Sequence, residues 1–154
     1  MRRATLTVLL CLCATAGFAT AASDQLTFIG DGFSIAPLQG CEALVMLLPS
    51  SDGFAPNVGV QIQPYSGTRD EYIALSKDQF RQIRAAIVRE QKKGPSGWVV
   101  EYTGDMGGRS FHWYARAELK NRKVYLATAT ATKEQWSSLS ARLRACVDSL
   151  KVVK

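Results

Sequence analysis

Apolar and polar residues alternate along several short stretches of the chain, and glycine and proline separate these stretches. The pattern predicts strands at residues 26–29, 33–36, 43–48 and 57–63. In the last of these, Val58, Val60 and Ile62 share one side, and asparagine and glutamine occupy the other. Alternation of this kind indicates a sheet with one buried face.

A helix is predicted after the fourth strand, because Thr68 and Glu71 have the spacing of a capping box. Apolar residues from Tyr72 to Ile87 lie near one stripe, and residues 92–95, Lys-Lys-Gly-Pro, are typical of a helix end. We therefore expect one helix from Thr68 to about Gly94. The basic residues around it are Lys77, Arg81, Arg84 and Arg89.

Three further strands and a second helix complete the pattern. Strands are predicted at residues 97–103, 109–120 and 123–130, joined by short turns as an antiparallel meander. A second capping box, Thr132 with Gln135, begins a helix with an apolar stripe that includes Trp136, Leu143 and Val147. The order predicts an α+β fold, in which an antiparallel sheet of about six to seven strands is packed by two main α-helices.

Several phrases of the sequence resemble a known family. They are Gly-Phe-Ser-Ile-Ala-Pro at residues 32–37, Val-Tyr-Leu-Ala-Thr-Ala-Thr-Ala-Thr at 124–132, Glu-Gln-Trp at 134–136 and Val-Asp-Ser-Leu at 147–150. These are similar to the opening strand, closing strand and last helix of PsbP-like proteins, including bacterial periplasmic relatives of the DcrB type. The resemblance implies an antiparallel sheet flanked by helices and a non-enzymatic binding or assembly role. It carries over no catalytic residue.

The beginning of the chain predicts export. Arg2 and Arg3 give a positive start, an apolar run follows over residues 6–18, and Ala19-Thr20-Ala21 is a cleavage site of the A-x-A type. The apolar run is shorter than the roughly 20 residues that span a bilayer, and no second run of that length follows. We expect a cleaved signal peptide at 1–21, one domain at 22–154 without a transmembrane segment, and a periplasmic or secreted location. Cleavage after Ala22 and a twin-arginine export route stay open.

Loss of the leader changes the cysteine inventory. Cys11 and Cys13 leave with it, and the remaining pair, Cys41 and Cys146, predicts one disulfide in an oxidising compartment. The alternatives are a reactive thiol or a metal site. Two distant cysteines and a single histidine fall short of a structural zinc set, so we expect neither a metal nor another cofactor.

The charge balance bears on the choice of partner. Without Arg2 and Arg3 the chain keeps 17 basic and 13 acidic side chains, a net charge of +4. A mildly basic exported protein favours anionic surfaces, such as lipid headgroups or acidic proteins. No nucleic-acid partner is expected, because the chain carries no aromatic-basic motif of that kind.

Two sets of residues are candidates for binding. The single histidine, His112, shares a strand face with Arg116, and Glu101 is expected on a neighbouring strand. Such a patch suits an anionic ligand or acid–base chemistry, but an ordinary solvated or helix-covered strand face is the favoured explanation. The basic set of Lys77, Arg81 and Arg84 suits an acidic protein or membrane surface, and plain solubility is the alternative.

The sequence thus predicts a function of binding and no catalysis. It contains no G-x-S-x-G, Walker A, H-E-x-x-H or C-x-x-C motif. We expect an exported accessory module that binds an envelope protein or component. An inhibitor or immunity-type protein that blocks an envelope-acting hydrolase is the second hypothesis, and an enzyme centred on His112 is the third.

Overall fold

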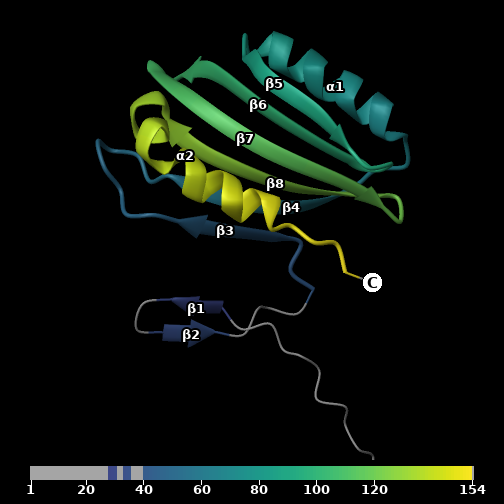
Figure 1. Cartoon of the computed structure of the whole chain (residues 1–154), viewed down its shortest axis with the longest axis horizontal. Coiled ribbons are helices and arrows are strands. Elements are labelled where there is room, and N and C mark those ends of the chain that lie inside the picture. The colour runs from purple at the N-terminus through teal and green to yellow at the C-terminus, as the bar shows by residue number, and fades with distance from the viewer. Residues whose placement is uncertain (1–27, 31–32, 36–39, 154) are drawn as a thin grey trace, which may run out of the picture. The chain divides into compact units, whose positions relative to one another are not determined.

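The computed structural model describes residues 28–30, 33–35 and 40–153 in two compact units. In the first unit, β1 (Phe28–Gly30) pairs antiparallel with β2 (Phe33–Ile35). The second unit holds a six-stranded antiparallel sheet and two helices (Figure 1). The predicted signal peptide lies outside the described residues.

The six strands of the second unit are all antiparallel to their neighbours. Their order across the sheet is β3 (Ala43–Leu47), β4 (Asn57–Pro64), β8 (Lys123–Thr132), β7 (Arg109–Lys120), β6 (Gly97–Met106) and β5 (Ala86–Lys93). The predicted meander of β6, β7 and β8 is confirmed, with β6 and β8 extending slightly further than expected. The edges of the sheet are β3 and β5.

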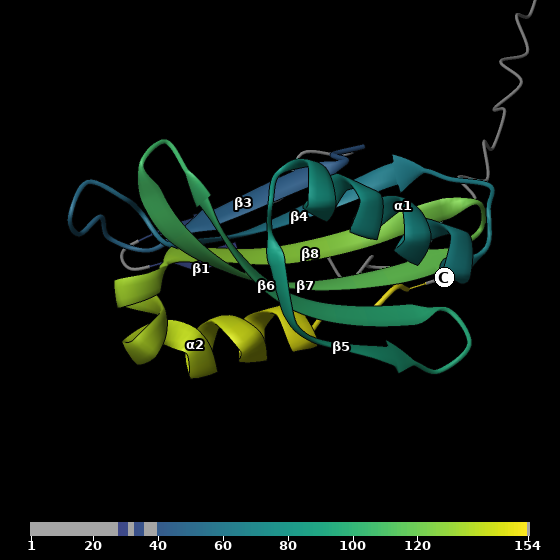
Figure 2. The ribbon, with the colours of Figure 1, turned by 90° about the horizontal axis from the view of Figure 1, so that it is seen from above.

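The two helices, α1 (Arg69–Gln82) and α2 (Lys133–Asp148), pack on opposite faces of this sheet (Figure 2). Both predicted capping boxes are present, with Thr68 accepting from the backbone of Glu71 and Thr132 from that of Gln135. Successive residues of a strand point to opposite faces, so Val100 of β6 joins the core under α1 and Val99 the core under α2.

The core under α2 combines small strand residues with large helix residues. Ala127, Ala129 and Ala131 of β8 are almost fully buried, and α2 packs Trp136, Leu143 and Val147 into the same cluster. Alanines at alternate positions leave room for the helix to lie close to the sheet. The predicted apolar stripe of the last helix is confirmed.

The segment after α1 departs from the prediction. The expected helix to Gly94 ends at Gln82, and the following residues form strand β5, paired with β6. Arg84 makes the turn with a φ of 55°, a left-handed conformation that usually takes glycine or asparagine. Arginine at this position gave no signal for a helix end. Three residues of the expected stripe are exposed: Leu75, Ile83 and Ile87.

The predicted fold class is confirmed: an antiparallel sheet with two helices, in α+β order. No helix among residues 40–153 is long and apolar enough to cross a membrane.

Candidate functional site

A buried carboxylate lies on the face of the sheet that α2 covers. Glu101 of β6 is only 2% exposed, and three cationic or ionisable side chains surround it. Its Oε2 accepts from Arg89 Nε at 2.5 Å, and its Oε1 accepts from Arg144 at 2.5 Å and from His112 Nε2 at 2.7 Å. Burial pulls the pKa of Glu101 upward, but these hydrogen bonds outweigh burial and leave the pKa below its usual range. The group is an ionised carboxylate at neutral pH.

His112 lies beneath the first turns of α2. Its ring stacks on Trp136, with centroids 4.2 Å apart and planes 7° from parallel, and its side chain is 13% exposed. The pKa of His112 is lowered, mainly by burial. The hydrogen bond and charge of Glu101 raise this pKa, and the positive charges of Arg144 and Arg89 lower it further. A carboxylate only accepts hydrogen bonds, so a neutral His112 carries its proton on Nε2 and directs it at Glu101. The ring is thus held by internal partners.

The ring of Tyr114 lies close to both arginines that bind Glu101. The guanidinium carbon of Arg89 is 5.5 Å and that of Arg144 is 5.9 Å from the centre of its ring, within the range of cation–π attraction. Its hydroxyl donates to Asp148 at 2.8 Å. Burial and the neighbouring Asp148 raise the pKa of Tyr114 to about 12, so the phenol stays protonated and acts as a fixed donor.

Arg116 fastens the end of α2 to the sheet. Its Nη1 donates to the backbone carbonyl of Asp148 at 2.7 Å, and its Nε and Nη2 both donate to Glu118. The last carbonyls of a helix lack partners within the helix and carry partial negative charge, so a guanidinium is a suitable cap. All three nitrogens of Arg116 are occupied by the protein itself.

A groove opens beside this cluster, between the end of α2 and the edge strand β5. Its volume is about 610 Å³, and its lining residues are Arg89, Glu90, Gln91, Lys93, Val99, Tyr114, Arg116 and Asp148. A second hollow of about 400 Å³ shares Arg116 and continues towards the C-terminal residues 150–152. The first volume falls within the range of small-ligand and peptide sites.

An irregularity in β5 determines which side chains enter the groove. Ile87 lies opposite Tyr102, but Arg89 lies opposite Glu101, so Val88 is an extra residue without a partner in the ladder. Such a bulge re-aims the side chains that follow it. If the strand were regular from Ile87 onward, Val88 would lie opposite Glu101, and Arg89 would lie opposite Val100 and point to the α1 face. Because Val88 is left unpaired, Arg89 reaches Glu101.

The predicted patch is therefore divided in the structure. Glu101 and His112 are brought together and covered by α2, whereas Arg116 lies further along β7 and lines the groove. The sequence reasoning missed Arg89, Arg144 and the cover provided by Trp136. Arg89 was missed because its segment was predicted as helix, and Arg144 has no local signal beyond its position two turns after Trp136 on the helix.

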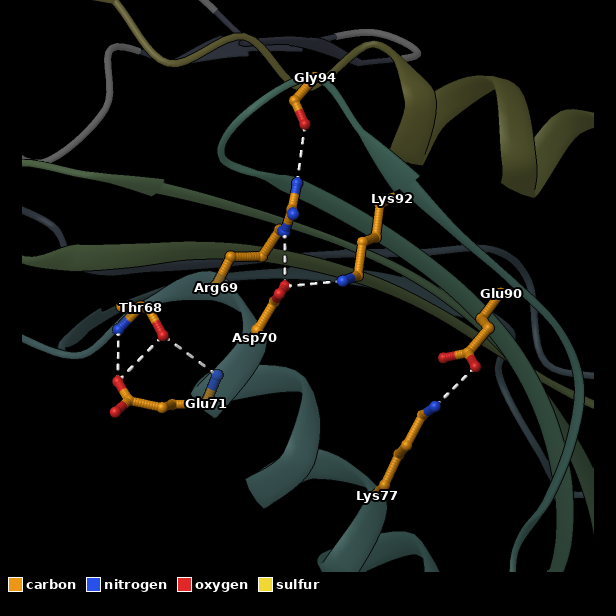
Figure 3. A network of polar contacts seen from close by, with 8 residues as sticks. All are labelled: Thr68, Arg69, Asp70, Glu71, Lys77, Glu90, Lys92 and Gly94. Atoms are coloured by element: carbon orange, nitrogen blue, oxygen red, sulfur yellow. Dashed lines mark hydrogen bonds and ion pairs between the residues drawn. The ribbon is translucent and has the colours of Figure 1, made fainter.

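The basic set expected on the first helix does not form one face. Lys77 pairs with Glu90 of β5 at 2.6 Å (Figure 3), Arg81 pairs with Asp78, and Arg84 is in the turn after the helix. The expectation that these residues lie on one helix was wrong for Arg84 and Arg89, because the helix ends at Gln82.

Ion pairs also hold the beginning of α1. Figure 3 shows Asp70 between Arg69 and Lys92, with Arg69 also donating to the carbonyl of Gly94 at 2.7 Å. These contacts tie α1 to the β5–β6 hairpin on the face away from the groove.

The two cysteines are free thiols in the structure. Cys41 lies before β3 and donates to the carbonyl of Ala43, whereas Cys146 packs at the edge of the core under α2. The predicted disulfide is not present and stays a prediction. Among the described residues 40–153, no group of three or more His, Cys, Asp or Glu side chains is arranged to hold a metal ion.

Comparison with known proteins identifies the fold. No protein-family model matches the chain, and no curated protein does. Among solved structures, PA94 of Pseudomonas aeruginosa, a protein of unknown function, is similar at a TM-score of 0.63 and 10% identity, over 84% of this chain and 97% of that one. Cyanobacterial PsbP from Synechocystis is matched at a TM-score of 0.48 and 13% identity, over 90% of this chain and 99% of that one. PA94 has the PsbP-like fold, so the fold predicted from the sequence resemblance is confirmed, at an identity that shows the fold alone.

Proposed function

We propose that the mature chain is an exported, non-enzymatic module that binds an envelope protein or another envelope component. The observation that carries the proposal is the contrast between the buried cluster and the groove. Every polar group of Glu101 is bonded within the protein, and His112 is stacked under Trp136. A residue held in this way serves stability, whereas the open groove next to it offers a surface for a partner.

Export and cleavage at residues 1–21 are part of this proposal, as is a periplasmic or secreted location. They are supported by the positive start, the short apolar run and the A-x-A site. Mass spectrometry of the protein recovered from its host tests them directly. A mature chain that begins at Ala22 or Ser23 is expected, and a full-length cytoplasmic chain would contradict export.

A disulfide between Cys41 and Cys146 is the third part. Cys146 is two residues from Arg144, which reaches β6, so about 200° of helix rotation directs Cys146 to the opposite side of α2, towards β4. The end of α2 is bonded to Arg116, and the register leads from Arg116 through Ala127 and Val60 to Leu44, close to Cys41. A bridge here would stabilise the fold by about 4–5 kcal/mol in the chain-entropy model.

The disulfide has a simple test. The mature protein from an oxidising compartment is expected to weigh two hydrogens less than after reduction, and to lose unfolding free energy when reduced. The single variants Cys41→Ser and Cys146→Ser serve as matched controls, since each should remove the effect of reductant. Two titratable thiols in the exported protein would contradict the bridge.

The binding function is tested by affinity capture with the mature chain from an envelope extract, followed by reconstitution with the purified candidate. A partner that binds with defined stoichiometry in both steps is expected. His112→Ala is the control for the enzymatic alternative. A catalytic turnover that disappears in His112→Ala while the fold is retained would overturn the proposal.

A further inference from the structure

We propose that the groove beside α2 binds an extended, acidic segment of a protein partner, with two carboxylates meeting Arg89 and Lys93. This inference rests on the proposed binding function and names its site and its ligand class. It follows from the geometry of β5, from the bonding state of the cations that line the groove, and from their spacing.

The bulge at Val88 gives the groove its cations. Beyond it, Arg89, Gln91 and Lys93 lie opposite Glu101, Val99 and Gly97 of β6. These β5 residues alternate with Glu90 and Lys92, which pair with Lys77 and Asp70 on the α1 face. Arg89, Gln91 and Lys93 thus share one face of β5, and Glu90, which also lines the groove, directs its carboxylate to Lys77.

The cationic side chains of the groove differ in how many of their N–H groups have no acceptor within the protein. Arg116 uses all three nitrogens on Glu118 and the carbonyl of Asp148. Arg89 uses only its Nε on Glu101, and its side chain is 56% exposed, so both terminal nitrogens are available. Lys93 is exposed and makes no ion pair among residues 40–153. Arg89 and Lys93 therefore have the most N–H donors left for a ligand, whereas Arg116, fixed by Glu118 and the end of α2, forms part of the wall.

The spacing of these two cations defines the ligand. They are four residues apart on one strand, which places them roughly 13 Å apart at about 3.3 Å per residue. An extended peptide running beside β5 has the same repeat, and its side chains point to one side at every second residue. Two acidic residues with three residues between them therefore match Arg89 and Lys93, and the central residue meets the amide of Gln91.

The remaining lining supports a peptide over a small anion. Val99 and the ring of Tyr114 supply apolar floor between the cations, and Asp148 provides an acceptor for a backbone N–H. A groove of about 610 Å³ is far larger than one carboxylate or phosphate needs. The neighbouring hollow extends the path for a continuing chain.

The probe is a short, terminally blocked serine–threonine peptide with two glutamates separated by three residues. Its twin carries glutamines at the same positions, and a third peptide has the glutamates separated by one residue. Fluorescence anisotropy at low ionic strength measures their binding to the mature protein. The first peptide is expected to bind at least about tenfold more tightly than the glutamine twin, and added salt should weaken it.

Variants of the protein assign the contact. Lys93→Gln and Arg89→Gln are each expected to weaken the glutamate peptide about two- to fivefold, as the loss of an exposed charge contact does, and the double variant should remove most binding. Arg142→Gln, which removes an exposed charge on the outer side of α2, is the matched control and should leave affinity unchanged. Lys93 has no internal partner, so Lys93→Gln keeps the test valid even if Arg89→Gln is unstable.

Equal affinity for the glutamate and glutamine peptides, or affinity unchanged in the double variant, would overturn the proposal. Binding to phosphatidylglycerol vesicles that depends on Arg89 and Lys93, without peptide binding, would overturn it in favour of a membrane surface. If affinity capture yields a partner that binds the double variant equally well, the groove is refuted while the proposed binding function stands.

Discussion

The two faces of the sheet are covered in different ways. On one face, α2 buries Trp136, Leu143 and Val147 and closes over a bonded carboxylate. On the other, α1 buries only Ile73 and Ser76 and rests on a row of aromatic rings. Its remaining ties are exposed ion pairs such as Lys77 with Glu90. The comparison teaches that α2 is buried more deeply against its face of the sheet than α1 is, and that the groove lies beside the more deeply buried helix.

The sharpest way to break this contrast is to remove the buried carboxylate. Glu101→Gln should destabilise the protein by about 3–5 kcal/mol, because the buried carboxylate loses its charge-assisted hydrogen bonds with Arg89, Arg144 and His112. Urea unfolding measures the change. Glu90→Gln on the α1 face, an exposed partner of Lys77, is the control and should cost no more than about 1 kcal/mol. Similar losses in both variants would refute the difference between the faces.

A pair of leucines compares the two helices directly. Leu143 of α2 is 3% exposed and Leu75 of α1 is 52% exposed. Leu143→Ala should cost about 2–5 kcal/mol, since it leaves a cavity in the core. Leu75→Ala should stay within about 0.5 kcal/mol, as surface substitutions usually do. Thermal unfolding of both variants in the same buffer is the measurement, and a large loss from Leu75→Ala would show that α1 is more deeply packed than this.

The pH dependence of stability sharpens the same contrast with a smaller effect. The folded-state pKa of His112 is lowered, mainly by burial, and that of Glu101 is lowered by its hydrogen bonds against the effect of burial. Both groups therefore contribute stability above their unfolded pKa values, about 6.5 and 4.3. That stability is lost as the pH falls through the folded values.

Unfolding free energy measured between pH 8 and pH 3 is thus expected to fall in two steps on acidification. His112→Gln should flatten the step below about pH 6.5, and Glu101→Gln the step in the carboxylate range. A protein whose stability rises between pH 7 and pH 5 would contradict the assignment for His112.

The smallest expected effect is at the surface of α1. Lys77→Gln should change the unfolding free energy by less than about 1 kcal/mol, because both partners of this ion pair are more than a third exposed. Added salt should reduce the difference from the wild type further. A salt-independent loss well above this range would mean that the pair fixes α1 to β5.

The sequence was sufficient where periodicity was long and undisturbed. β7 alternates over twelve residues, and its bounds were predicted as they are. The stripe of α2 from Trp136 to Val147 and both capping boxes were also predicted correctly. Here local preference and tertiary packing favour the same structure, so the prediction needed no knowledge of the neighbours.

The sequence was insufficient where a partner strand decided the structure. Residues 86–93 have apolar and basic residues that fit a helix, but pairing with β6 gives them a strand. The turn at Arg84 has a left-handed backbone conformation, but the sequence has no glycine there that would predict a helix end. The prediction of the candidate site was incomplete for the same reason. Alternation along the strands places Glu101 and His112 on one face, whereas Arg89 and Arg144 come from elements whose position depends on the whole fold.

The unpaired residue in β5 has a consequence for how relatives should be compared. The side chains that follow Val88 change faces according to the number of residues before them and not according to their identity. A register slip of one residue that paired Val88 with Glu101 would send Glu90 and Lys92 into the groove and Arg89, Gln91 and Lys93 out of it, with every charge retained. An alignment that places a gap one position away would therefore match residues from opposite sides of the sheet. In this strand a change of register by one residue would change the chemistry of the surface more than any single substitution.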